Sequence, residues 1–388
     1  MLLNKLKKEP PLGWAQLRSQ KVRLLVALIA IAAADIMIFT MLGFKESFYG
    51  GFSNLHKQLR GDLFLVSNRA ESLFDGQTFS RRHLYQVSAI DGVVSANPLY
   101  FSSGNWVNPW SNKISSVAVI AFDPAHPVIE LPEIDEQLEQ IKLPNIVLFD
   151  SLSLAKLGPI PESLTQGKTI TTEISGRRIK VGGIFTLGSS IFIDGHIVTS
   201  DWNYLRLFGS DSIDNLKVGI LTLQPGADLE TVKRNVQAYL PEDIDVMTHQ
   251  EFINSEEDYW AKHPGGIIFD FGVVMGFFIG VVIVYEVLHS DVNDRLAEYA
   301  TLKAIGYSDR NLLSVVFQEA IILAVLGFIP GFIGSIGIYT LLGSMTRIPI
   351  AIQPDVALRV FSLTVSMCIA SGAIAIRKLQ AADPAEVF

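Results

Sequence analysis

The feature that most constrains this chain is a pair of long apolar segments separated by a short charged stretch, between residues 267 and 342. As helices, residues 267–288 would be about 33 Å long and residues 312–342 about 46 Å long. The hydrocarbon core of a bilayer is about 30 Å thick. Both segments are therefore predicted to cross a membrane. The second must tilt or bend, and Pro330 gives it a place to bend.

Two further runs, at residues 24–44 and 356–376, are also long and apolar enough to span. Between the first and second spans lie residues 45–266, with no spanning run and with alternating strand and helix patterns. This predicts an α-helical membrane protein with four transmembrane helices and one large extracytoplasmic α+β domain. The remaining segments are an amphipathic N-terminus at 1–23, a connector at 289–311, a loop at 343–355 and a tail at 377–388.

Charge predicts which side of the membrane each part occupies. Six Lys and Arg residues precede the first span, so the positive-inside rule places the N-terminus in the cytoplasm. Four spans then place the connector and the tail inside and the large domain outside. Residues 46–266 hold 27 acidic and 17 basic residues, and an acidic domain argues against a nucleic-acid surface.

The large domain has readable local elements. Strands are predicted at 63–67, 115–121, 145–149, 169–174, 178–185, 191–198, 216–223 and 243–247, and a short helix at 152–157. A helix that ends at Leu240, with Asp228 as its N-cap, separates the last two strands. Together with the turn at Pro225-Gly226, this indicates a β-α-β unit.

The connector between the second and third spans has the pattern of a short helix rather than of slack chain. Leu296, Tyr299, Leu302 and Lys303 recur at helical spacing, and Gly306 follows as a stop. A rigid helix between two spans is suited to docking into a partner. The alternative is a solvated connector, and the pattern alone does not choose between them.

The residues of this connector resemble those of a known family. Glu298-Tyr-Ala-Thr-Leu-Lys-Ala-Ile-Gly306 resembles the cytoplasmic loop of FtsX/MacB-like permeases of ABC transporters. Glu319 followed by Gly327 and Gly331 is similar to the next segment of that family, and Tyr299-Ala-Thr301 resembles its DevC branch. The order of short motifs in residues 146–185 resembles the MacB-like periplasmic core domain.

The resemblance implies a permease subunit of an exporter in the inner (plasma) membrane, working as a homodimer with a separate ATPase. The DevC likeness implies export of a lipid or glycolipid through a periplasmic adaptor and an outer-membrane channel. The connector would dock into the ATPase through Arg295, Glu298, Tyr299, Leu302, Lys303, Ile305 and Gly306.

No enzyme chemistry is predicted for the chain itself. Gly167-Lys168-Thr169 ends like a phosphate-binding loop, but Glu162 stands where its first glycine is required. The seven histidines show no metal-ligand spacing, and no serine lies in a nucleophile elbow. No cofactor, metal or catalytic residue is expected. The single cysteine, Cys368, excludes an internal disulfide.

Three carboxylates within or beside the spans, Asp35, Glu286 and Glu319, invite a functional interpretation as a proton or substrate relay. For Glu286 and Glu319, structural pairing is favoured. Asp35 lies at mid-depth with no basic residue level with it, so it is the better functional candidate and is expected to face a partner subunit. Gly327, Pro330 and Gly331 predict close helix packing, with a hinge as the alternative.

Two other classes of function compete with the exporter. A secondary transporter would use the intramembrane carboxylates, but only four spans and no inverted repeat argue against it. A receptor or scaffold without transport has no visible output domain. Co-purification of an ATPase would distinguish the exporter from both.

Overall fold

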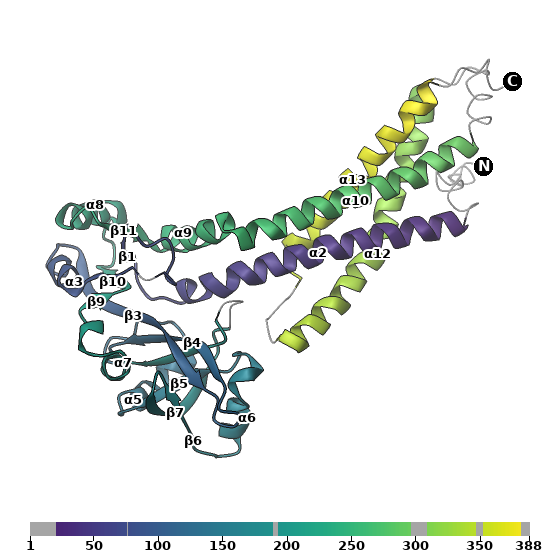
Figure 1. Cartoon of the computed structure of the whole chain (residues 1–388). Helices are drawn as coiled ribbons and strands as arrows, with labels where there is room; N and C mark the ends of the chain where they lie inside the picture. The colour runs from purple at the N-terminus through teal and green to yellow at the C-terminus, as the bar shows by residue number, and fades with distance from the viewer. Residues whose placement is uncertain (1–20, 76, 189–192, 296–308, 347–351, 382–388) are drawn as a thin grey trace, which may run out of the picture. The chain divides into compact units, whose positions relative to one another are not determined.

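The computed structural model describes residues 21–75, 77–188, 193–295, 309–346 and 352–381 (Figure 1). The chain divides into two compact units, each described here by itself. The helical unit comprises Met1–Lys45, Ile267–Leu342 and Ile350–Phe388, and the α/β unit comprises Glu46–Gly266 and Gly343–Pro349.

Four long helices carry the apolar segments. They are α2 (Lys21–Lys57), α10 (Pro264–Asp294), α12 (Asp309–Thr346) and α13 (Pro354–Ala381). By length and composition, each contains a stretch able to cross a membrane: Lys21–Tyr49, Pro264–Asp294, Ser314–Gly343 and Pro354–Ala375. Helices suit a bilayer because every backbone hydrogen bond lies within the segment. The predicted fold class, four membrane helices with an α+β domain, is confirmed.

The helical unit has two apolar clusters. One gathers Ile31, Val284, Leu323 and Met367 from all four helices, and the other gathers Phe39 with Tyr339 and Val360. Large apolar side chains also cover the outside of α10, among them Phe271 (62% exposed) and Phe278 (59% exposed). In water such a surface would be costly, whereas lipid tails or another apolar protein surface would cover it without penalty.

Within the described residues of the α/β unit, nine strands form one sheet in the order β11-β1-β10-β3-β4-β8-β5-β7-β6. The strands are β1 (Leu63–Ser67), β3 (Val93–Val107), β4 (Ile114–Phe122), β5 (Ile146–Asp150), β6 (Ile170–Ile174), β7 (Arg177–Phe185), β8 (His196–Ser200), β10 (Val218–Leu223) and β11 (Ile244–Thr248). Most pairs are antiparallel, but β4–β8 and β5–β7 are parallel. An additional pairing of Trp106 in β3 with Ile174 in β6 closes six strands into a ring.

Short helices cover the sheet. They are α3 (Arg81–Val87), α4 (Pro132–Asp135), α5 (Leu138–Ile141), α6 (Ile160–Thr165), α7 (Asp201–Phe208), α8 (Leu229–Tyr239) and α9 (His249–Lys262). Figure 1 places α3 and α8 beside β1, β10 and β11, and α5 and α6 beside β5, β7 and β6. Two apolar cores result, one around Trp106 and Tyr100 and the other around Phe64 and Phe122.

The predicted β-α-β unit is present as β10, α8 and β11. Strands β10 and β11 are both antiparallel to β1, which lies between them, so they run parallel to each other. Gly226 has a φ of +86°, as the predicted turn requires. Asp228 is the N-cap residue of α8, but its side chain makes no capping hydrogen bond to the backbone and instead accepts from the Thr231 hydroxyl.

Several local predictions were wrong. The helix expected at 152–157 is a single 3₁₀ turn, Ala155–Leu157, and the strand expected at 191–198 is described only as His196–Ser200. The strand expected at 216–223 breaks at Lys217, because Asn215–Leu216 (β9) pairs with Phe79–Ser80 (β2) in a separate small sheet. The longest strand, β3, was missed. It contains Pro98, Gly104 and Asn105, residues typical of turns, and only pairing on both sides holds it extended.

Candidate functional site

The predicted docking helix falls largely outside the described residues. Glu298, Tyr299, Leu302, Lys303, Ile305 and Gly306 all lie in the undescribed segment 296–308. Arg295 is described at the end of α10. Its guanidinium lies 3.1 Å from the Asp291 carboxylate, and its side chain is 11% exposed. Arg295 therefore pairs within the chain, and its predicted role toward a partner stays a prediction.

Asp35 lies on α2 and is completely buried within the helical unit. The Thr364 hydroxyl on α13 donates a hydrogen bond to Asp35 Oδ1 at 2.6 Å. Its other oxygen, Oδ2, has no hydrogen-bond partner among the described residues. The expectation that Asp35 faces a partner subunit is therefore wrong, because α12 and α13 of the same chain enclose this carboxylate.

The other two carboxylates differ from each other. Glu286 on α10 is exposed at the surface of the helical unit. Glu319 on α12 is completely buried, and neither of its carboxylate oxygens has a hydrogen-bond partner in the described part of the chain. The structural pairing favoured for these two residues is not seen there. A buried carboxylate without donors is costly in an apolar medium, so Glu319 joins Asp35 as a candidate for function.

The glycines of α12 lie against α2. A Cβ atom on Gly327 would lie 2.6 Å from Ile31 Cγ2, and one on Gly331 would lie 2.7 Å from Asp35 Cβ. Gly334 lies equally close to Ile36, whereas Gly337 has nothing within 4 Å. The absence of side chains at the first three positions lets the two helices approach closely. Pro330 lies inside the same helix, between Gly327 and Gly331.

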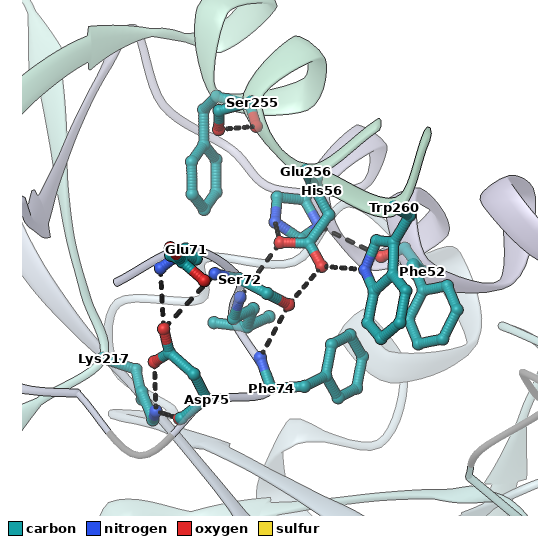
Figure 2. Close-up of polar contacts among 12 residues, drawn as sticks. Phe52, His56, Glu71, Ser72, Phe74, Asp75, Lys217, Ser255, Glu256 and Trp260 are labelled. Atoms are coloured by element: carbon teal, nitrogen blue, oxygen red, sulfur yellow. Dashed lines mark hydrogen bonds and ion pairs between the residues drawn. The ribbon is translucent and has the colours of Figure 1, made fainter. Parts of the chain in front are cut away.

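The α/β unit contains a buried polar cluster that the sequence analysis did not identify (Figure 2). Glu256 on α9 is 2% exposed. Its Oε1 accepts hydrogen bonds from the Ser72 hydroxyl at 2.6 Å and from Trp260 Nε1 at 2.7 Å. Its Oε2 accepts from the Leu73 backbone N–H at 2.9 Å and lies 3.3 Å from His56 Nε2. One carboxylate thus ties together α2, the loop after β1 and α9.

His56 is completely buried. Its Nδ1 lies 3.2 Å from the Phe52 carbonyl, to which it donates, and its Nε2 faces the Glu256 carboxylate. Burial alone would raise the pKa of Glu256, but His56 and the donors of Ser72 and Leu73 lower it below its usual value.

A second buried charge lies near this cluster. Lys217, between β9 and β10, has a side chain that is 10% exposed, and its ammonium lies 3.7 Å from Asp75 Oδ1. The ammonium also donates to the Asp75 backbone carbonyl. Burial lowers the pKa of Lys217, and the Asp75 carboxylate opposes that shift. Figure 2 shows Lys217 and Asp75 on one side of the cluster and the rings of Phe52 and Trp260 on the other.

One sequence signal could have revealed the cluster. Phe252, Glu256 and Trp260 recur every four residues, so they share one face of α9. Phe252 and Trp260 are apolar and buried, which places the carboxylate between them in a buried stripe. His56 and Ser72 could not have been found in this way, because they are about 200 and 184 residues away in the chain.

Comparison with known proteins bears on the helical unit. Residues 271–384 match the family described as FtsX-like permease C-terminal. The matched residues comprise most of α10 and the whole of α12 and α13. No curated protein sequence matches the chain.

Solved structures match part of the chain with low similarity. The periplasmic region of MacB from Actinobacillus actinomycetemcomitans aligns over 53% of this chain and 96% of its own length, with a TM-score of 0.34 and 10% identity. The extracellular domain of the noncanonical ABC-type transporter YknZ from Gram-positive bacteria aligns over 48% of this chain and 99% of its own, with a TM-score of 0.31 and 11% identity.

The matched residues include most of the predicted site residues. Glu286, Glu319, Gly327, Pro330 and Gly331 all lie among them, and so does the undescribed segment 296–308. Asp35 and the Glu256 cluster lie outside the matched residues. Asp35 nevertheless contacts them, since its hydrogen-bond donor Thr364 is one of the matched residues.

Proposed function

We propose that this protein is the permease subunit of an ABC exporter and is driven by an ATPase on a separate polypeptide. The match of residues 271–384 to the FtsX-like permease family carries the proposal. Four apolar helices supply the membrane part. Between the ends of α10 and α12 lie only 14 residues, 295–308, which would contact the ATPase.

The proposal fixes a topology. The segment after Arg295 would lie in the cytoplasm and the α/β unit outside it, in the periplasm of a cell with two membranes. The basic N-terminal flank and the four candidate spans support this topology. A single cysteine placed near residue 130 should react with an impermeant thiol reagent on intact cells, and one placed near residue 300 should not. Cys368 is buried and would first be replaced by Ala. The opposite labelling pattern would contradict the proposal.

Docking of the ATPase is tested at Leu302. If Leu302 and Ile305 contact a groove of the ATPase, with Glu298 and Lys303 at the rim, then Leu302→Asp places a charge at the centre of that contact. We expect loss of ATPase co-purification, while membrane insertion and protease protection of the α/β unit remain. Leu302→Met is the matched control, since it keeps an apolar side chain of similar volume. Normal binding and export by Leu302→Asp would show that the segment is a solvated connector.

The proposal includes a homodimer. Of the four spans, α10 is the least buried within the chain, with 17% of its apolar window buried, compared with 28–39% in the others. A second copy would cover that surface and, with α2 beside it, would place the first two spans near the two-fold axis. A permease stoichiometry of one in the purified complex with the ATPase would contradict this part of the proposal.

For the substrate we propose a lipid or glycolipid, passed to a periplasmic adaptor and an outer-membrane channel. The support is the DevC-like Tyr299-Ala-Thr301 and the wider resemblance of the connector. Deleting the gene and comparing the lipids of the outer membrane and the medium tests it. Export that continues when the Walker lysine of the ATPase is replaced would instead favour a secondary transporter that uses Asp35 and Glu319.

A further inference from the structure

The α/β unit contains a cavity of about 500 Å³ next to the Glu256 cluster. Small-molecule sites in proteins have volumes of about 300–1,000 Å³. The cavity is bounded by α2, β3, β4, α7, α9 and the loop that carries Asp75. All of its lining residues belong to the α/β unit, so its shape does not depend on the helical unit.

One part of the wall is aromatic. The rings of Phe52 and Trp260 stack with their centroids 3.7 Å apart and their planes at 12°. Phe74 meets Phe52 edge-on at 5.1 Å and Phe101 edge-on at 5.0 Å. Because each ring is fixed by its neighbours, this wall offers an apolar surface that needs no rearrangement to receive an apolar group.

Another part of the wall consists of hydroxyl groups in pairs. Ser102 Oγ and the Tyr204 hydroxyl are 2.6 Å apart, and Ser103 Oγ and Ser116 Oγ are 2.8 Å apart. Each pair uses one O–H donor and leaves the other free, together with several acceptor lone pairs. These groups can bind the oxygen atoms of a polar headgroup.

Lys217 supplies a single positive charge to the cavity. Its ammonium has three N–H donors, and among the described residues both its hydrogen bond and its ion pair are with Asp75. The Asp75 carboxylate is itself occupied, since it accepts from the backbone N–H groups of Glu71 and Gln77 at 2.7 and 2.9 Å. A buried ammonium with unused donors is unfavourable, and an anionic oxygen in the cavity would satisfy them.

We propose that this cavity binds a single-chain amphiphile with one anionic oxygen group. The anionic group would contact Lys217 and the paired hydroxyls, and the apolar chain would lie against the Phe74 and Trp260 rings, which pack on the buried Phe52. A polyanion such as a nucleotide does not fit, because Lys217 is the only basic side chain among the described residues of the lining and the Asp75 carboxylate lies beside it. Binding is independent of the proposed permease function and can be measured without an ATPase, so failure of either proposal is separate from failure of the other.

The test is calorimetric titration of the full-length protein in lipid nanodiscs, with empty nanodiscs as the blank. Octyl sulfate, which carries one negative charge, is the probe. Octyl glucoside has the same tail with an uncharged headgroup, and inorganic sulfate has the anionic oxygens without the tail. We expect saturable binding of one octyl sulfate per chain, at least roughly ten-fold tighter than octyl glucoside, and no binding of inorganic sulfate. Equal binding of the two octyl compounds, or comparable binding of inorganic sulfate, would overturn the proposal.

Two substitutions locate the binding in the cavity. Lys217→Met keeps the approximate length of the side chain and removes its charge, and should raise the Kd for octyl sulfate roughly ten- to hundred-fold. Lys113→Met changes an exposed lysine of the β3–β4 hairpin and should leave the Kd unchanged. Ser116→Phe fills the cavity from an exposed position and should abolish binding without unfolding the unit. An unchanged Kd in Ser116→Phe would show that the probe binds elsewhere and would overturn the proposal.

Discussion

Two buried carboxylates, one in each unit, show how differently the two units are stabilised. Asp35 in the helical unit receives one hydrogen bond, from Thr364. Glu256 in the α/β unit receives three, from Ser72, Leu73 and Trp260, and has His56 beside it. Both are less than 3% exposed. Two equally buried carboxylates can therefore accept very different numbers of hydrogen bonds.

The difference follows from the state to which each unit unfolds. The α/β unit unfolds into water, where a carboxylate is well hydrated, so burial of Glu256 is tolerated only with a full set of donors. A helix in a bilayer keeps its polar side chains in an apolar medium even when the helices separate, and hydrogen bonds between membrane helices are worth only about 0.6–2 kcal/mol. A single donor among the described residues, Thr364, is therefore enough for Asp35 to stay buried in the helical unit.

The chain offers a separate reporter for each unit. Four of the five tryptophans, at positions 106, 110, 202 and 260, belong to the α/β unit, so Trp fluorescence follows its unfolding. The single cysteine, Cys368, is buried in the helical unit, so a thiol-reactive dye follows the opening of that unit. The predictions below use these two signals, in order of decreasing expected effect.

The largest effect is expected for Glu256→Ala. It leaves the donors of Ser72 and Trp260 buried and unpaired and removes the carboxylate that faces His56, so the free energy of unfolding of the α/β unit should fall by about 3–5 kcal/mol. Urea unfolding followed by Trp fluorescence measures this. Glu257→Ala is the control on the same helix, because Glu257 makes only a surface pair with Lys57 and should change stability by less than about 1 kcal/mol. Similar losses of unfolding free energy in the two variants would show that the hydrogen bonds of Glu256 do not stabilise the α/β unit.

Gly331→Val should affect the other unit. A side chain at this position collides with Asp35 on α2, and overpacking of this kind costs about 1–3 kcal/mol. The same change at Gly337, which has nothing within 4 Å among the described residues, should cost less than about 0.5 kcal/mol. Heating with the thiol-reactive dye compares the two variants. Equal melting temperatures for both would show that close contact of α2 and α12 does not stabilise the helical unit.

Asp35→Asn should change the stability of the helical unit little, but it should reduce export strongly. The amide keeps the shape and the acceptor for Thr364, so we expect a loss of less than about 1 kcal/mol in the dye assay. ATP-driven export should fall because the exchangeable charge is lost. Asp270→Asn is the control, since that carboxylate is more than half exposed and pairs with Lys45. Full export by Asp35→Asn would make this carboxylate purely structural.

The smallest effect concerns pH. The pKa of Glu256 is lower in the folded unit than in the unfolded chain, so its stabilisation is fully present above the unfolded pKa of about 4.3 and is lost as pH falls through the folded pKa. The free energy of unfolding of the α/β unit should therefore decrease below about pH 4. In Glu256→Gln this decrease should be shallower. Identical pH profiles would show that other carboxylates control acid unfolding.

Length and hydropathy alone determined the four membrane helices. The backbone hydrogen bonds of a helix all lie within one segment, and so does the apolar sequence pattern that predicts it. The β-α-β unit was readable for a similar reason: its strands and helix follow one another, with Pro225-Gly226 marking the turn. The acidic character of residues 46–266 also comes from the sequence alone.

Tertiary structure decided everything that depends on residues far apart. Strand β3 exists because β10 and β4 pair with it on both sides, against the local preference of Pro98 and Gly104. Asp35 meets Thr364 across 329 residues, and Glu256 meets Ser72 across 184. No local pattern encodes such contacts, because chain folding and close packing alone determine which distant side chain supplies the donor.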